Sequence, residues 1–157
     1  MVNTVGKKVS EVLRSYTAGF LDADGAIMAP IERHQDKRFK FRIRVIVKFT
    51  QRDRDKLDQL KEGFGIGKVV NNGSAYDWVI KDQYHVQWFL KLLLPHIKVK
   101  ENQALIALQI VGLPKSTQAE LLEVASLADT LSSYNVRSKH RRRNNSLMIQ
   151  ETFSRND

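Results

Sequence analysis

The fold of this chain is decided by one stretch, Thr17-Ala18-Gly19-Phe20-Leu21-Asp22-Ala23-Asp24-Gly25. The residues that lead into it, Glu11 to Leu21, carry apolar side chains at helical spacing, and Ser10 is a suitable N-cap. We therefore expect a first helix that ends near Asp22. Carboxylates at the C-terminal end of a helix are unfavourable beside the helix dipole unless a positive charge offsets them. The two acids at this end therefore indicate a cation.

These two acids, Asp22 and Asp24, lie two residues apart, and residues at that spacing do not face each other on a helix. They are not expected to form a paired site within one chain, whereas a partner subunit could supply the second carboxylate. Small side chains recur at every fourth position of the helix, at Ser15, Gly19 and Ala23. Such a stripe lets two helices approach closely. The alternative is an ordinary helix C-terminus with a left-handed Gly25.

The composition is that of a compact, strongly basic protein. Its 157 residues are enough for one domain, and 42% apolar with 27% charged residues is typical of a globular chain. Lys and Arg outnumber Asp and Glu by 26 to 17, a net charge of +9. This excess favours a polyanionic partner, because neutralising phosphates releases condensed counterions. Nucleic acid is the first expectation, and an anionic membrane surface is the second.

Several classes of protein are excluded. The sequence has no cysteine, so disulfides, zinc fingers and thiolate catalysis are ruled out, and a metal must be held by oxygen or imidazole. The four histidines have no spacing that indicates a metal pair. No apolar run is long enough to span a bilayer, and the first ten residues lack the apolar stretch of a signal peptide. We therefore expect an intracellular protein with no membrane partner.

The remaining pattern predicts an α+β fold with an antiparallel sheet. Expected strands cover Ala26–Ile31, Phe41–Phe49, Lys68–Val70 and Tyr76–Ile80, with a charged connection over Glu32–Lys40 and a hairpin turn at Asn71-Asn72-Gly73-Ser74. Expected further helices cover Arg54–Phe64, Tyr84–Leu94, Glu101–Val111 and Thr117–Tyr134. The chain divides into an N-terminal arm (1–9), one domain (10–135) and a basic C-terminal tail (136–157) that has some helical character.

The stretch Thr17 to Gly25 resembles the LAGLIDADG motif of homing endonucleases. It agrees at Ala18, Gly19, Asp22, Ala23, Asp24 and Gly25, with Thr17 in place of the opening leucine. The predicted order of helices and strands also resembles that family, whose αββαββα fold has a saddle-shaped antiparallel sheet followed by C-terminal helices. A single copy of the motif resembles the homodimeric branch. The resemblance implies that the motif helices of two chains pack together, with an interface at Ser15, Ala18, Gly19, Asp22 and Ala23.

The same resemblance implies a site and a reaction. Asp24, with the backbone carbonyl of Ala23, would bind Mg²⁺, a hard cation that takes oxygen ligands. Gln51 resembles the residue that orders active-site water, and Lys100 resembles the lysine that stabilises phosphate charge. Arg54 is our choice for the family's basic residue after the glutamine, where this chain is shorter. Without the resemblance, Gln51 reads equally well as part of a capping turn and Lys100 as a solvated surface lysine.

The expected strands have one basic outward face. The strand residues Phe41, Ile43, Val45, Val47 and Phe49 alternate with Arg42, Arg44, Ile46 and Lys48. Counting by two along all strands places a larger set outward: Met28, Pro30, Glu32, Arg42, Arg44, Ile46, Lys48, Val70, Asn72, Asp77 and Val79. Such a face is compatible with the major groove, where Arg42 and Arg44 would bind guanine and the two valines would touch thymine methyl groups. A merely solvated face is the alternative.

The resemblance predicts a homodimer that makes a staggered double-strand break in a long pseudo-palindromic DNA site, in a prokaryotic cytoplasm or an organelle, so that its own intron is inserted. Lys139, Arg141 and Arg142 in the basic tail would hold phosphates beside the site. Two alternatives remain: an RNA-binding relative that helps its own intron to splice, and a non-cutting DNA-binding regulator. The presence of both Asp24 and Lys100 favours the endonuclease.

Overall fold

The computed structural model describes residues 8–135 and 145–156. Helix α1 (Glu11–Asp24) begins after Ser10, whose side chain accepts a hydrogen bond from the N–H of Leu13 at 3.2 Å. It ends at Asp24, two residues later than expected. Gly25 then has an extended backbone (φ −77°), so the left-handed ending is wrong. Glycine is required there by packing, because a Cβ would lie 2.8 Å from the Cα of Leu21.

The strands of the described residues form two antiparallel sheets. They are β1 (Ala26–Met28), β2 (Ile31–Arg33), β3 (Phe41–Ile43), β4 (Ile46–Gln51), β5 (Lys68–Asn71) and β6 (Tyr76–Ile80). The larger sheet has the order β1-β4-β6-β5, and β2 pairs with β3 in a separate ribbon. This arrangement of helices and antiparallel strands confirms the α+β expectation.

Two strands that we expected to be continuous are interrupted. The expected strand over 26–31 breaks at Ala29-Pro30, because proline has no N–H for the ladder, and pairing resumes in β2. Glu32 and Arg33 therefore belong to a strand, and not to the connection in which we placed them. The strand over 41–49 breaks at Val45, whose N–H and C=O bond the side-chain amide of Gln83 at 2.9 and 2.8 Å. Gln83 thus replaces the strand partner at this bend.

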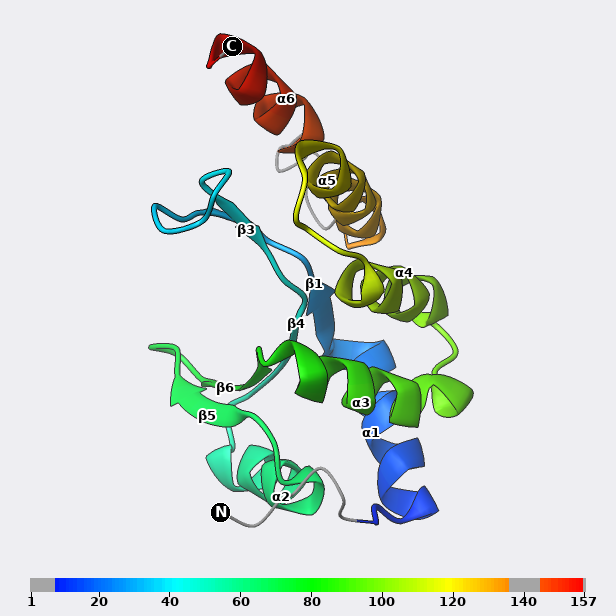
Figure 1. Ribbon diagram of the computed structural model, residues 1–157. Coiled ribbons are helices and arrows are strands. Elements are labelled where there is room, and N and C mark those ends of the chain that lie inside the picture. Colours follow the sequence, from blue (N-terminus) through cyan, green and yellow to red (C-terminus); the bar gives the residue numbers. More distant parts are fainter. Residues whose placement is uncertain (1–7, 136–144, 157) are drawn as a thin grey trace.

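The helices follow the predicted pattern closely. They are α2 (Arg54–Phe64), α3 (Gln83–Leu93), the short 3₁₀ turn η2 (Leu94–His96), α4 (Glu101–Gly112), α5 (Gln118–Tyr134) and α6 (Asn145–Arg155). Figure 1 shows α3, α4 and α5 along one side of the sheets, while the β2–β3 and β5–β6 hairpins extend towards the other side. Within the described ranges no helix combines the length and the apolarity needed to cross a membrane.

The core lies between the inner face of the sheet and the helices. Phe49 stacks on Trp78 with ring centroids 5.0 Å apart, and Phe20 of α1 lies 5.2 Å from Phe49. The buried Trp78 donates its indole N–H to the carbonyl of Ile66 at 3.0 Å. Val9, which we placed in the arm, is also buried. The inward-facing apolar side chains of the strands therefore pack α1 against the sheet.

Helix α6 is packed against the rest of the chain. Its N-terminus is held by Asp129 of α5, whose carboxylate accepts the N–H groups of Asn145 and Ser146, each at 3.0 Å. Near its end, the ring of Phe153 lies edge-on to Phe39, with centroids 5.8 Å apart. Phe153 also lies edge-on to Phe41 at 6.4 Å, so α6 packs against β3 and the loop before it.

Candidate active site and nucleic-acid interface

Asp22 and Asp24, at the end of α1, have different surroundings. The carboxylate of Asp22 accepts the backbone N–H groups of Lys98 and Lys100 at 2.8 and 2.9 Å. Burial raises the pKa of Asp22, but the N–H groups of Lys98, Lys100 and Val99 outweigh burial and lower the pKa overall. Asp24 is exposed and has no hydrogen-bond or ion-pair partner among the residues that the structure describes. Of the two acids, Asp24 is therefore the one whose carboxylate is available to a ligand from outside the described residues.

Lys100 is brought to the same helix end. Its ammonium donates to the backbone carbonyl of Asp22 at 2.7 Å, which satisfies a carbonyl that the helix leaves unpaired and places a positive charge at the negative end of the dipole. The backbone carbonyl of Asp22 thus meets Lys100 at the helix end, while its carboxylate holds the loop before α4.

The donors at this end fit a hard cation, although the described residues of one chain do not complete a site. The Asp24 carboxylate and the Ala23 carbonyl are oxygen donors, which Mg²⁺ prefers. In the described part of the chain, no three His, Asp or Glu side chains come close enough together to hold a metal. A cation bound here would take further ligands from water, from a substrate or from a second chain.

Gln51 is the last residue of β4, and Arg54 is the first residue of α2. Gln51 pairs with Tyr76 of β6, and the guanidinium of Arg54 lies over the ring of Tyr76 at 5.8 Å. Arg54 also bonds Asp58 at 3.1 Å. Gln51 lines a hollow of about 430 Å³ between α1, α2 and the end of β4. No hydrogen bond joins Gln51 or Arg54 to Asp24 in the described residues, but β1, which follows Asp24 and Gly25, starts beside the C-terminal part of β4, where Ala26 pairs with Lys48.

One face of α1 has no partner among the residues that the structure describes. Val12 and Tyr16 are 80% and 65% exposed, and Gly19 and Ala23 continue the same face at i+7 and i+11. A Cβ at Gly19 would meet nothing within 4 Å. Of the other residues expected at a subunit interface, Ser15 is exposed and lies 3.2 Å from the ring of His96, Asp22 is held by the loop, and Ala18 is fully buried in its own core. Ala18 therefore offers no surface to a second chain.

Register places the expected outward positions of β1, β4, β5 and β6 on one face of the larger sheet, and it pairs Glu32 with Arg42 in the separate ribbon. Register pairs Lys48 with Val79, and pairs Asp77 with both Thr50 and Val70. Val70 is 45% exposed, whereas Ile46 and Asp77 are each only 8% exposed. Met28 and Pro30 are half-buried. The outward face of the strands thus has a mixed polar and apolar surface. Ile46 contributes little exposed area to it.

Carboxylates neutralise cations at two places on this face. Glu32 bonds Arg42, its register partner, and lies 3.7 Å from Arg44. The hydrogen bond from Arg42 lowers the pKa of Glu32. Asp77 lies 3.8 Å from the ammonium of Lys48 and accepts the hydroxyl of Thr50 at 2.6 Å. Arg42, Arg44 and Lys48 are therefore oriented side chains and not freely solvated ones.

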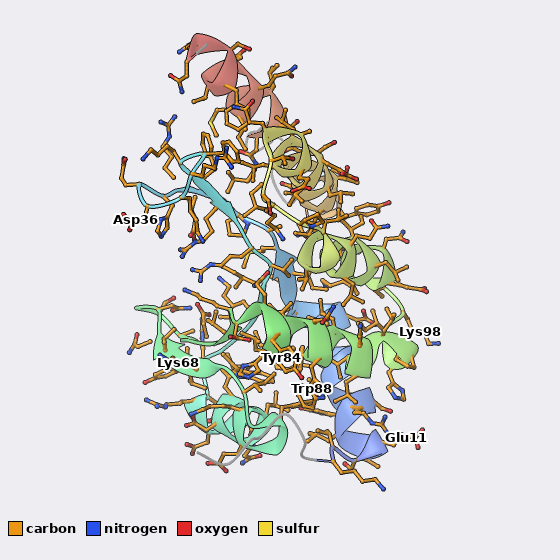
Figure 2. The ribbon with its side chains drawn as sticks, in the orientation of Figure 1. Glu11, Asp36, Lys68, Tyr84, Trp88 and Lys98 are labelled. Atoms are coloured by element: carbon orange, nitrogen blue, oxygen red, sulfur yellow. The ribbon has the colours of Figure 1, made fainter. Side chains whose placement is uncertain are left out.

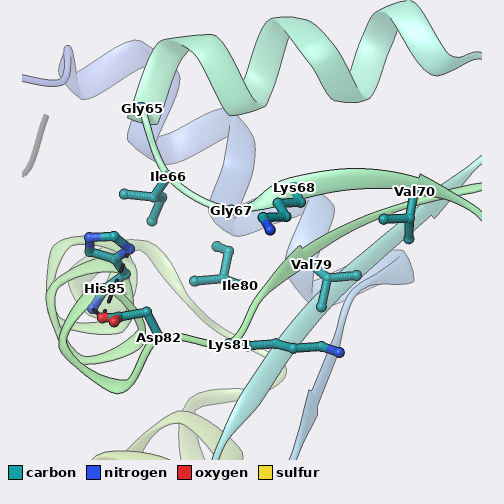
Figure 3. Close-up of a pocket in the computed structure, with 10 residues that line it drawn as sticks. All are labelled: Gly65, Ile66, Gly67, Lys68, Val70, Val79, Ile80, Lys81, Asp82 and His85. Atoms are coloured by element: carbon teal, nitrogen blue, oxygen red, sulfur yellow. Dashed lines mark hydrogen bonds and ion pairs between the residues drawn. The ribbon is translucent and has the colours of Figure 1, made fainter. Parts of the chain in front are cut away.

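Three positions were missed by the sequence analysis. Lys68, Lys81 and Thr50 continue the same period-two series beyond Val70, Val79 and Lys48, and extending the count by one step would have found them. Lys68 and Lys81 line a pocket of about 530 Å³ between β5, β6 and the start of α3 (Figure 3). In Figure 2, Lys68 and Asp36 both point to the side away from α4.

The predicted phosphate contacts Lys139, Arg141 and Arg142 lie outside the described residues.

Comparison with known proteins decides the family. The model of the family described as LAGLIDADG endonuclease matches residues 17–103, which is more than half of the chain. The chain belongs to the LAGLIDADG endonuclease family. This LAGLIDADG protein is 33% identical to the DNA endonuclease I-CreI of Chlamydomonas reinhardtii over 125 residues, covering 76% of this chain and 77% of that one. The DNA endonuclease I-CvuI of Chlorella vulgaris is 33% identical over 121 residues, covering 73% and 74%.

Solved structures agree with the fold of this LAGLIDADG protein. The crystal structure of I-CvuI in complex with the I-CreI target in the presence of Mg superposes with a TM-score of 0.85 at 27% identity, covering 92% of this chain and 94% of that one. The archaeal intron-encoded homing endonuclease I-Vdi141I, complexed with DNA, superposes with a TM-score of 0.79 at 22% identity, covering 92% and 98%. The predicted fold class and family are thereby confirmed.

Proposed function

We propose that this LAGLIDADG protein is a homodimeric, metal-dependent endonuclease that makes a staggered double-strand break in a long pseudo-palindromic DNA site. The observation that carries the proposal is found at the end of α1: Asp24 is exposed and has no partner among the described residues, and the Lys100 ammonium bonds the carbonyl of Asp22. The relatives at 33% identity are named DNA endonucleases, and a similar structure was determined with DNA and Mg.

The α1 face supports the dimer. Val12, Tyr16, Gly19 and Ala23 form one stripe on the helix that bears Asp24, and exposed apolar area of this kind favours association. Packing this stripe against itself about a two-fold axis is an isologous contact, in which each chain contributes the same surface. It brings the two Asp24 side chains together and supplies the carboxylate that a single chain lacks. A two-fold dimer in turn requires a pseudo-palindromic site.

The chain's own residues have separable tasks in hydrolysis. Mg²⁺ held by Asp24 and the Ala23 carbonyl would polarise the scissile phosphate and make bound water more acidic. Lys100 places an ammonium where negative charge develops on phosphate oxygens. Gln51, which lines the hollow beside α1, would orient the attacking water, and Arg54 would add positive charge near it. Asp22 carries no reacting atom and instead holds the backbone of Lys100.

The outward sheet face supports recognition of the duplex. A two-stranded ribbon fits the major groove of B-DNA, and the β2–β3 and β5–β6 hairpins extend to the same side of the molecule (Figure 1). Arg42, Arg44 and Lys48 supply donors for base edges, while Lys68 and Lys81 lie at the margin, where they can meet phosphates. The net charge of +9 supports binding through counterion release.

A cleavage selection tests the proposal. A randomised duplex library is treated with the wild type and with Asp24→Asn, each with Mg²⁺ and with EDTA, and the released ends are sequenced. We expect staggered ends at one pseudo-palindromic sequence, produced only by the wild type with Mg²⁺. Bound sequences without any ends would contradict nuclease activity and favour a DNA-binding regulator. Selective retention of RNA over DNA would favour a splicing factor.

A further inference from the structure

Asp77 and Lys48 form an unusual pair in the middle of the outward sheet face. They lie on neighbouring strands, β6 and β4, in diagonal positions, since Lys48 pairs with Val79 and Asp77 pairs with Thr50. The Lys48 side chain is 36% exposed, and the Asp77 side chain is 11% exposed. A carboxylate at this position repels DNA phosphates, so its presence on a DNA-binding face calls for a specific use.

The two oxygens of Asp77 have different roles. Oδ1 accepts both hydrogen bonds, from the Thr50 hydroxyl at 2.6 Å and from the Asn72 amide at 3.1 Å. The Asn72 amide cannot turn over, because its own oxygen accepts the N–H of Ala75 at 2.8 Å. Among the described residues, Oδ2 has the Lys48 ammonium as its one partner, at 3.8 Å, which is beyond hydrogen-bond distance. An uncommitted acceptor and an uncommitted donor therefore stand side by side.

This arrangement complements the major-groove edge of a G·C pair. Guanine presents the acceptors N7 and O6, and cytosine beside it presents the N4 amino donor. The Lys48 ammonium has three N–H donors and can serve both guanine acceptors, while Oδ2 of Asp77 accepts from cytosine N4. An A·T pair instead places a donor between two acceptors, so the ammonium has no adjacent pair of acceptors to bind.

We infer that Lys48 and Asp77 together read one G·C base pair in each half of the DNA site, with Thr50 and Asn72 as positioning residues that fix the carboxylate. The inference rests on the proposed function and adds to it one determinant of sequence specificity. The neighbouring Val70 and Val79 are apolar and would contact thymine methyl groups at the adjacent base pairs. They do not compete for the G·C pair that Lys48 and Asp77 read.

Asp77→Asn gives the sharpest test, because the structure determines which way the new amide turns. Thr50 and Asn72 both donate to Oδ1, so the amide oxygen must take that position and the NH₂ group must take the place of Oδ2. The substitution thus exchanges an acceptor for a donor without changing shape. A donor there is mismatched to cytosine N4 and matched to the O4 acceptor of thymine.

The experiment selects bound duplexes from a randomised library in EDTA, where no cutting occurs, using the wild type, Asp77→Asn and Lys48→Met. We expect the wild type to prefer G·C by about tenfold or more at one pair per half-site, and both variants to lose this preference at the same pair. Asp77→Asn should bring A·T to within about twofold of G·C, or above it.

Two controls separate this effect from general loss of binding. Lys91→Met removes an exposed charge on α3, away from the sheet face, and should leave every base preference unchanged. Glu32→Gln alters the other carboxylate cluster and should change preferences only at other base pairs. An unchanged G·C preference in Asp77→Asn would overturn the inference and leave the proposed function intact. Absence of any enriched duplex with the wild type would instead overturn the proposed function.

Discussion

Asp22 and Lys100 hold each other through two opposite hydrogen bonds: the Asp22 carboxylate accepts the Lys100 backbone N–H at 2.9 Å, and the Lys100 ammonium donates to the Asp22 carbonyl at 2.7 Å. The first acid of the motif therefore ties the loop before α4 to the end of α1. The second acid, Asp24, is left exposed, so the two acids have separate tasks.

Asp22→Ala should lower the free energy of unfolding by about 1–2 kcal/mol, because two hydrogen bonds to a charged acceptor are lost. Cleavage should fall roughly ten- to a hundredfold, because Lys100 loses its fixed position. Urea denaturation and a single-turnover cleavage assay measure the two effects. Metal-free DNA affinity serves as the control and should not change. Loss of stability with full cleavage would show that Lys100 is positioned without Asp22.

Asp24→Asn should abolish cleavage while DNA affinity in EDTA and thermal stability stay at the wild-type level. The exposed carboxylate has no partner in the described residues, so its removal leaves no buried group unsatisfied. Gel-shift titration, a cleavage assay with Mg²⁺ and a thermal melt give the three readouts. Equal loss of binding and cleavage would mean that Asp24 has a structural role.

Gly19→Leu should convert the dimer to a monomer without unfolding the chain. The site is open within one chain, and leucine favours a helix over glycine by about 0.8 kcal/mol, but the side chain would hold two α1 helices apart. Sedimentation velocity and circular dichroism measure assembly and folding. Gly112→Leu, at the equally open end of α4, is the matched control. A Gly19→Leu protein that stays dimeric would place the interface elsewhere.

Glu32→Gln should lower stability at neutral pH and lose this effect in acid. The folded state lowers the pKa of Glu32, chiefly through Arg42, so its stabilisation is fully present above the unfolded pKa of about 4.3. It disappears as the pH falls below that value through the folded pKa. Thermal melts of both proteins between pH 7 and pH 3 should show that the difference in melting temperature between the wild type and Glu32→Gln becomes smaller as the pH falls. A difference that is constant with pH would contradict an ionised Glu32 as its cause.

The affinity for duplex DNA should fall steeply with salt, with a slope of about −4 or steeper in a plot of log affinity against log salt. Lys68→Met and Lys81→Met should each reduce the slope by about 1 if they meet phosphates. Fluorescence anisotropy across a salt series measures this dependence. Lys91→Met should leave the slope unchanged, and a flat wild-type dependence would contradict binding driven by phosphates.

Local signals predicted the helices well, because capping residues and helical periodicity act within a few residues. Ser10 and Thr117 mark helix starts as expected, and Thr117 forms a capping box with Glu120. The strand breaks were harder to predict. The bend at Val45 depends on Gln83, which is 38 residues away, and no local pattern at Val45 indicates that partner. The outward face was found by counting, but the count stopped one step short of Thr50, Lys68 and Lys81.

The sequence by itself predicted the family, the order of most elements and the alternating faces of the strands, and it pointed to Asp24 as the metal ligand. The elements and the faces follow from residue type and short-range spacing, whereas the family and the role of Asp24 come from the resemblance of Thr17 to Gly25 to the family's motif. Only the tertiary structure decided that Asp22 holds the Lys100 loop, that Gln51 and Arg54 gather at Tyr76, and that Asp77 presents one free oxygen beside Lys48. Hydrogen bonds between segments that are distant in the sequence depend on distances and angles that only the folded structure sets. Residue spacing along the chain therefore does not predict them.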